Sequence, residues 1–96
     1  MSYNNENTLS SVLKAMFSDE KTKPMFFQTK IEGAWRKQMG STVNNYTDEI
    51  SLRNRILYIK ITSSSLKQEF LYSKDTIIEF ANKVCEEEYV TQVVIL

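Results

Sequence analysis

Apolar residues recur at helical spacing in the first forty positions. A first stripe consists of Leu9, Val12, Leu13, Met16 and Phe17. A second consists of Phe27, Ile31, Ala34, Trp35 and Met39. Both match the i, i+3, i+4, i+7 spacing of an amphipathic helix, so we predict helices at about 8–18 and 23–39. Pro24 suits the first turn of the second helix, and Gly40 stands where a left-handed C-cap is needed.

The period changes to two after Gly40. Apolar positions alternate with polar ones through Leu57, Ile59 and Ile61, and a similar segment precedes them. We predict strands at about 47–53 and 56–62, joined by a two-residue turn at Asn54-Arg55. Arg is a poor substitute for the Gly that such a turn prefers at its second position.

A third helical stripe follows the serine run at 63–65. Ser65 and Gln68 fit a capping box at its start, and Ser73-Lys74-Asp75 is a candidate interruption before the helix ends near residue 86. The β-branched segment from Tyr89 to Leu96 predicts a last strand. The order α-α-β-β-α(split)-β predicts one α+β domain, with a three-stranded sheet and helices packed on one face.

Composition narrows the possible chemistry. The chain has 96 residues, no histidine and one cysteine, Cys85. These counts exclude Ser-His-Asp and Cys-His catalysis, His-ligated metal sites, an intrachain disulfide and a thiolate zinc site. The longest apolar run, 93–96, is too short to span a bilayer. We expect a cytoplasmic protein that is not an enzyme and has no catalytic residues, cofactor, metal or membrane contact.

Charge is unevenly distributed along the chain. From residue 1 to 67, Lys and Arg number 10 and Asp and Glu number 6; from 68 to 96 the counts are 2 and 6. The asymmetry indicates either a basic binding face or an acidic, solvated helix end at 86–88.

The predicted hairpin carries the main candidate site. Arg53, Arg55 and Lys60 lie around it, and Tyr58 shares a strand face with Lys60. Cations beside an aromatic ring on an exposed sheet face are typical of single-stranded nucleic-acid binding. The alternative is a hairpin that is basic only to stay soluble.

Trp35 is a second candidate. With Arg36 and Lys37 beside it, its ring could stack on a base, but its spacing favours a core position. Ser63 to Ser65 could meet a phosphate, although a strand-to-helix turn needs the same residues. Cys85 is expected to fill the core. Further expected core or structural positions are Phe27, Ile31, Gly40, Leu57, Ile59 and Phe70.

A longer ordered pattern resembles a known family. It comprises Ile31-Glu-Gly-Ala-Trp-Arg-Lys-Gln-Met-Gly40, then Tyr46-Thr47, then Leu52-Arg-Asn-Arg-Ile-Leu-Tyr-Ile-Lys-Ile-Thr-Ser-Ser-Ser-Leu-Lys-Gln-Glu-Phe-Leu71. Ile77-Ile78, Asn82 and Val90 to Ile95 continue it. The set resembles the DciA-type bacterial domain over about residues 9–96, and we assign 8–96 to this domain and 1–7 to a disordered N-terminus.

The resemblance implies a KH-like fold and a non-enzymatic role as an accessory or loader of the replicative DnaB-type helicase, with affinity for DNA. The chain lacks the GxxG loop by which KH domains clamp a nucleic-acid backbone. Zero net charge implies weak, salt-sensitive DNA binding. The alternative is an adaptor domain that binds only protein, and which forms a homodimer through an open sheet edge.

Overall fold

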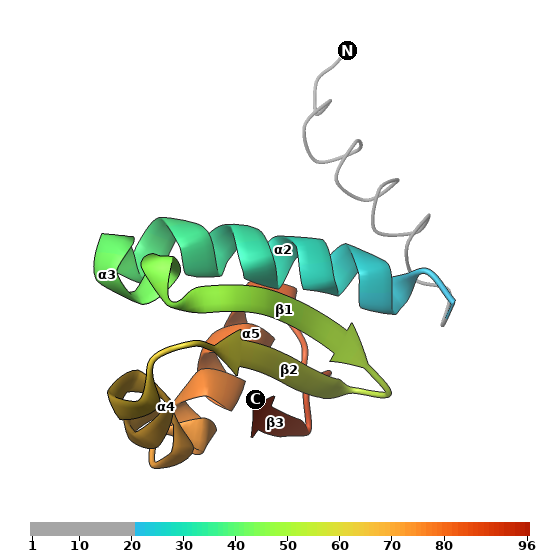
Figure 1. Cartoon of the computed structure of the whole chain (residues 1–96). Coiled ribbons are helices and arrows are strands. Elements are labelled where there is room, and N and C mark those ends of the chain that lie inside the picture. The colour runs from blue at the N-terminus through green and yellow to red at the C-terminus, as the bar shows by residue number, and fades with distance from the viewer. Residues whose placement is uncertain (1–20) are drawn as a thin grey trace.

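The computed structural model describes residues 21–96. The expected helix at 8–18 and the polar segment 1–7 lie outside these residues. The described elements, in chain order, are α2 (Lys23–Gln38), α3 (Gly40–Asn45), β1 (Thr47–Arg53), β2 (Ile56–Ile61), α4 (Ser64–Leu71), α5 (Lys74–Cys85) and β3 (Gln92–Ile95) (Figure 1). The predicted α+β class and the split third helix are both confirmed.

Helix α2 begins and ends as its sequence predicts. Pro24 occupies the first turn, and Phe27, Ile31 and Trp35 are buried along one face. Gly40 has a φ of +84°, the left-handed conformation that stops a helix at little steric cost. The short helix α3 then starts at Gly40 itself, which the sequence did not predict because its GSTVNN segment carries a single large apolar residue.

The three strands form one mixed sheet in the order β1-β2-β3. β1 and β2 pair antiparallel, whereas β3 runs parallel to β2. Both turn residues have positive φ, +53° at Asn54 and +66° at Arg55, as a tight two-residue hairpin requires. The two helices between β2 and β3 supply the crossover that a parallel neighbour needs.

Two details of the C-terminal half differ from the sequence prediction. The cap of α4 is Ser63, not Ser65: Ser63 is extended, and its Oγ accepts a hydrogen bond from the Leu66 backbone N–H. The last strand begins at Gln92 rather than Tyr89. Glu86 ends α5 with a φ of +62°. The backbone N–H groups of Tyr89 and Val90 then donate to the Asn82 side chain instead of pairing with a strand.

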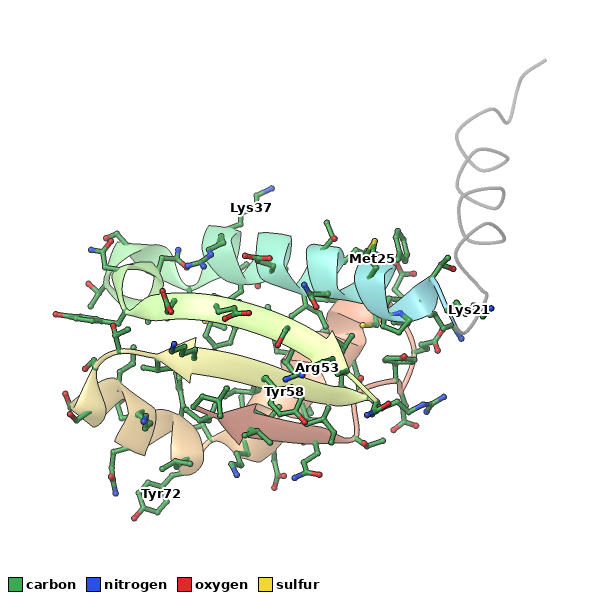
Figure 2. All side chains as sticks on the ribbon, turned by 45° about the vertical axis from the view of Figure 1, so that its right-hand side comes forward. Lys21, Met25, Lys37, Arg53, Tyr58 and Tyr72 are labelled. Atoms are coloured by element: carbon green, nitrogen blue, oxygen red, sulfur yellow. The ribbon has the colours of Figure 1, made fainter. Side chains whose placement is uncertain are left out.

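The core lies between one face of the sheet and the helices. Its buried apolar residues are Phe27, Ile31, Trp35, Ile50, Leu52, Leu57, Ile59, Ile61, Ile77, Ala81, Cys85, Tyr89, Val90 and Val93. Phe70 is only partly buried, but its ring packs on Trp35 with centroids 5.5 Å apart. Within residues 21–96 no helix crosses the opposite face of the sheet, which is therefore open (Figure 2).

Candidate nucleic-acid interface

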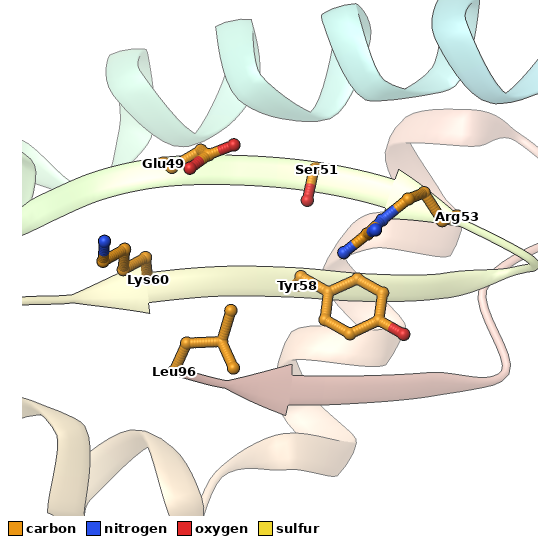
Figure 3. A pocket seen from close by; sticks show the side chains of 6 residues that line it. All are labelled: Glu49, Ser51, Arg53, Tyr58, Lys60 and Leu96. Atoms are coloured by element: carbon orange, nitrogen blue, oxygen red, sulfur yellow. The ribbon is translucent and has the colours of Figure 1, made fainter.

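The open face of the sheet carries a small polar hollow. From Ile50 onward in β1, and throughout β2, side chains alternate between the core and this face because successive residues of a strand point to opposite sides. The hollow measures about 80 Å³ and is lined by Glu49, Ser51, Arg53, Tyr58, Lys60 and Leu96 (Figure 3). We use "open face" for these six residues together with Asp48.

Arg53 and Tyr58 form the most specific contact on the open face. The guanidinium carbon of Arg53 lies 4.6 Å from the centroid of the Tyr58 ring, within the range of a cation–π interaction. Arg53 pairs with Ile56 in the β1–β2 register, and Ser51 pairs with Tyr58, so Arg53 reaches Tyr58 diagonally across the two strands. The contact holds a cation and an aromatic ring side by side on an exposed surface.

Lys60 lies at the other end of the open face beside two carboxylates. Its Nζ is 3.6 Å from Asp48 Oδ2, and both side chains are 54% exposed. Glu49 faces Lys60 directly in the strand register. The pair of cations Arg53 and Lys60 is therefore matched by two carboxylates.

The six predicted nucleic-acid residues do not lie together. Arg53, Tyr58 and Lys60 share the open face, as their spacing predicted. Arg55 instead reaches Tyr89, with its guanidinium carbon 4.8 Å from the ring centroid. Tyr89 belongs to the core, so Arg55 is directed toward the helix side of the sheet.

Arg36 and Lys37 lie on α2, away from the open face. Arg36 donates from Nη1 to the backbone oxygens of Asn44 and Thr47, at 3.2 and 3.1 Å, which ties α2 to α3 and β1. Lys37 is exposed and points away from Arg53 and Tyr58 (Figure 2). Arg36 therefore has a structural role in this geometry.

Four residues of the open face were not predicted as site residues: Asp48, Glu49, Ser51 and Leu96. Period-two alternation backwards from Arg53 finds Ser51 and Glu49. The position of Asp48 depends on an irregularity, since the register shifts between Thr47 and Glu49. Leu96 joins the face because β3 runs parallel to β2, which the strand pattern alone does not reveal.

Trp35 belongs to the core, as its spacing favoured. The residue is fully buried, and its Nε1–H donates to Thr47 Oγ1 at 3.2 Å. Thr47 Oγ1 in turn donates to the Val43 backbone oxygen at 2.7 Å. Three residues of the pattern that resembles the DciA domain thus have a common structural explanation, because the turn at Gly40 brings Thr47 back to Trp35.

The serine run and the charge asymmetry also have structural explanations. Ser63 and Ser65 line a second hollow of about 270 Å³ between α3 and α4, which no Lys or Arg lines, so it offers a phosphate no counter-charge. Lys23 and Lys30 of the basic half pair with Glu87 and Glu86 of the acidic half, at 3.3 and 3.6 Å. Two lysines of the basic part of the chain are therefore neutralised by glutamates of the acidic part.

Cys85 is a free cysteine whose side chain is buried in the core. It is 4% exposed, and this burial raises the pKa of its thiol to about 11, although the nearby Lys30 opposes the shift. Among residues 21–96 no three His, Cys, Asp or Glu side chains are grouped to hold a metal ion. No helix in the same range is long and apolar enough to cross a membrane.

Comparison with known proteins agrees with the resemblance noted in the sequence. The family model described as "Dna[CI] antecedent, DciA" matches residues 8–95. Neither the curated proteins nor the solved structures contain a match, so the KH-like label stays a prediction. Because the match covers nearly the whole chain, this protein belongs to the DciA family, which is associated with helicase loading in bacteria.

Proposed function

We propose that this domain is a non-enzymatic accessory or loader protein of the bacterial replicative, DnaB-type helicase, and that its open face binds single-stranded nucleic acid weakly. Membership of the DciA family supports the first part. The observation that carries the second is the contact between Arg53 and Tyr58, on a sheet face that no helix of residues 21–96 covers.

The open face offers the two interactions that a single strand needs. An unpaired base stacks on an aromatic ring or a guanidinium plane, and Tyr58 and Arg53 supply one of each. Lys60, along the same strand from Tyr58, supplies a cation for a phosphate. A duplex would not use Tyr58 in this way, because its bases are already stacked on one another.

Binding through this face is weak because few charges take part. Two cations that neutralise two phosphates of a single strand give a salt slope of about −1.4 in log K against log salt. Asp48 and Glu49 reduce the attraction further. The domain therefore depends on its protein partner for stable placement on DNA.

Fluorescence anisotropy with a labelled oligo-dT tests the nucleic-acid part. The double variant Arg53→Ala/Lys60→Ala removes both cations of the open face and should abolish salt-dependent binding. Lys37→Ala/Lys74→Ala removes two cations from α2 and α5 and is the matched control, which should bind as the unaltered protein does. Equal affinity of the two double variants would rule out the open face as the binding site.

Size-exclusion chromatography with light scattering tests the helicase part. The domain and the replicative helicase of the same organism should co-elute as a complex, with and without single-stranded DNA. Absence of a complex at tens of micromolar would contradict the loader role.

The second candidate function is an adaptor that binds only protein. Tyr72 is 82% exposed and Leu71 43% exposed at the junction of α4 and α5, so two adjacent side chains offer apolar surface to a partner there. In that case oligo-dT would not bind at any salt concentration, and light scattering would detect a protein complex or a homodimer.

A further inference from the structure

We propose that Asp48 and Glu49 limit the nucleic-acid affinity of the open face, and that Lys60 exchanges Asp48 for a phosphate when a strand binds. The inference rests on the proposed function of the same face. It assigns a role to two residues that would otherwise count as ordinary surface carboxylates.

A β-bulge brings the two carboxylates together. Thr47 and Ile50 are 5% and 2% exposed, so both point into the core although they are three positions apart. Regular alternation does not allow this, and the register shift between Thr47 and Glu49 absorbs the additional residue. As a result two consecutive residues, Asp48 and Glu49, are both exposed beside Lys60.

The bulge changes the charge of the open face. Without the bulge, regular alternation would place only one of Asp48 and Glu49 on the open face. With the bulge, both carboxylates lie on the same face as the two cations Arg53 and Lys60. The side chains of the open face therefore carry no net charge. A phosphate that approaches Lys60 meets two nearby negative charges, whereas one that approaches Arg53 meets the Tyr58 ring.

The Lys60–Asp48 pair is built so that it can be displaced. The 3.6 Å separation and the 54% exposure of both side chains describe a solvated ion pair, which contributes little free energy. A phosphate can therefore take the place of Asp48 at the Lys60 ammonium. A bound nucleic-acid strand is then held mainly by Arg53 and Tyr58, and it dissociates quickly.

Asp48→Asn/Glu49→Gln tests this proposal with the full chain and a labelled oligo-dT. We expect the variant to bind about three- to ten-fold more tightly, since each removed carboxylate is an exposed charge near the strand. Glu79→Gln/Glu88→Gln changes the net charge equally at two exposed positions outside the open face, one on α5 and one in the loop after it. It is the matched control, for which the affinity should not change. Glu49→Gln alone, at a carboxylate that forms no ion pair with another residue between 21 and 96, should give part of the gain.

A double-mutant cycle tests the exchange step. If Asp48 occupies Lys60 in the free protein, Lys60→Ala should lose more affinity in the Asp48→Asn background than in the unaltered protein. Equal losses in the two backgrounds would overturn the exchange. Equal affinity of Asp48→Asn/Glu49→Gln and its control would overturn the limiting role of the carboxylates.

The same titrations separate this proposal from the proposed function. If the unaltered protein binds and Arg53→Ala/Lys60→Ala does not, the open face is the site, and unchanged binding by Asp48→Asn/Glu49→Gln overturns only the role of the carboxylates. If none of these proteins binds oligo-dT, the proposed nucleic-acid function fails, and this inference fails with it.

Discussion

Asn82 hydrogen-bonds both backbone polar groups of Val90. Its Nδ2 donates to the Val90 oxygen at 3.0 Å, and its Oδ1 accepts from the Val90 N–H at 2.7 Å. The same Oδ1 accepts from the Tyr89 N–H at 3.1 Å. One side chain of α5 thus satisfies the backbone of the buried segment that leads into β3.

Removal of this amide is expected to destabilise the domain strongly. Tyr89 and Val90 are each 3% exposed, so water cannot readily replace the three hydrogen bonds in the Asn82→Ala variant. We expect a loss of about 2–4 kcal/mol in the free energy of unfolding, measured by urea denaturation. Asn45→Ala, at an exposed position at the end of α3, is the control; a loss below about 0.5 kcal/mol for both variants would contradict this role of Asn82.

Thr47 is expected to matter for stability because of its hydroxyl. Thr47→Val keeps the shape of the side chain but leaves the buried Trp35 Nε1–H without its acceptor. It also removes one of the two hydrogen bonds that the Val43 oxygen accepts, the other coming from the Tyr46 backbone N–H. The free energy of unfolding should fall by about 1–3 kcal/mol. Thr47→Ser retains the hydroxyl and should lose less; a larger loss for Ser than for Val would show that packing, not hydrogen bonding, decides the position.

Much of the fold is predictable because local signals agree with the tertiary structure. Pro24 and Gly40 limit α2, and the alternation from Leu57 to Ile61 defines β2. The structure departs from the prediction where several neighbouring residues could fill the same role. Any of three successive serines can cap a helix, and only the place where β2 ends selects Ser63.

The shortened β3 and the bulge have tertiary causes. Asn82 takes the backbone groups of Tyr89 and Val90, which the strand propensity of this segment does not anticipate. The bulge follows from the need to bury both Thr47 and Ile50, and Thr47 is buried because Trp35 needs an acceptor.

The candidate site is predictable to the same extent. The spacing of Tyr58 and Lys60 places them on one face whatever the surroundings, because it depends only on the strand period. The long side chains of Arg36 and Arg55 take their directions from distant partners, the Thr47 backbone and the Tyr89 ring. Adjacency in sequence to Trp35 or to the hairpin was therefore no guide to their position.

Arg55 is expected to show a preference for glycine. Its φ of +66° is a conformation in which a Cβ is unfavourable, so Arg55→Gly should be more stable than Arg55→Ala by about 1 kcal/mol. Both variants lose the contact with Tyr89, so thermal unfolding of the pair isolates the backbone effect. Equal stability of the two variants would contradict this backbone effect.

Because Arg55 is directed away from the open face, Arg55→Gly should also affect oligo-dT binding less than Arg53→Ala does.

Cys85 is expected to make the domain less stable in alkaline solution. Burial raises the pKa of its thiol from 9.0 to about 11, so the folded protein holds the thiol proton at pH values where the unfolded chain releases it. The resulting stability is fully present below pH 9 and is lost as the pH rises through about 11. A shift of this size corresponds to roughly 2–3 kcal/mol. Urea unfolding at pH 8 to 11 should show this decline in the unaltered protein, in excess of any decline in Cys85→Ala, which lacks the thiol and is the control. Parallel declines in the two proteins would mean that the thiol ionises equally easily in the folded and unfolded states.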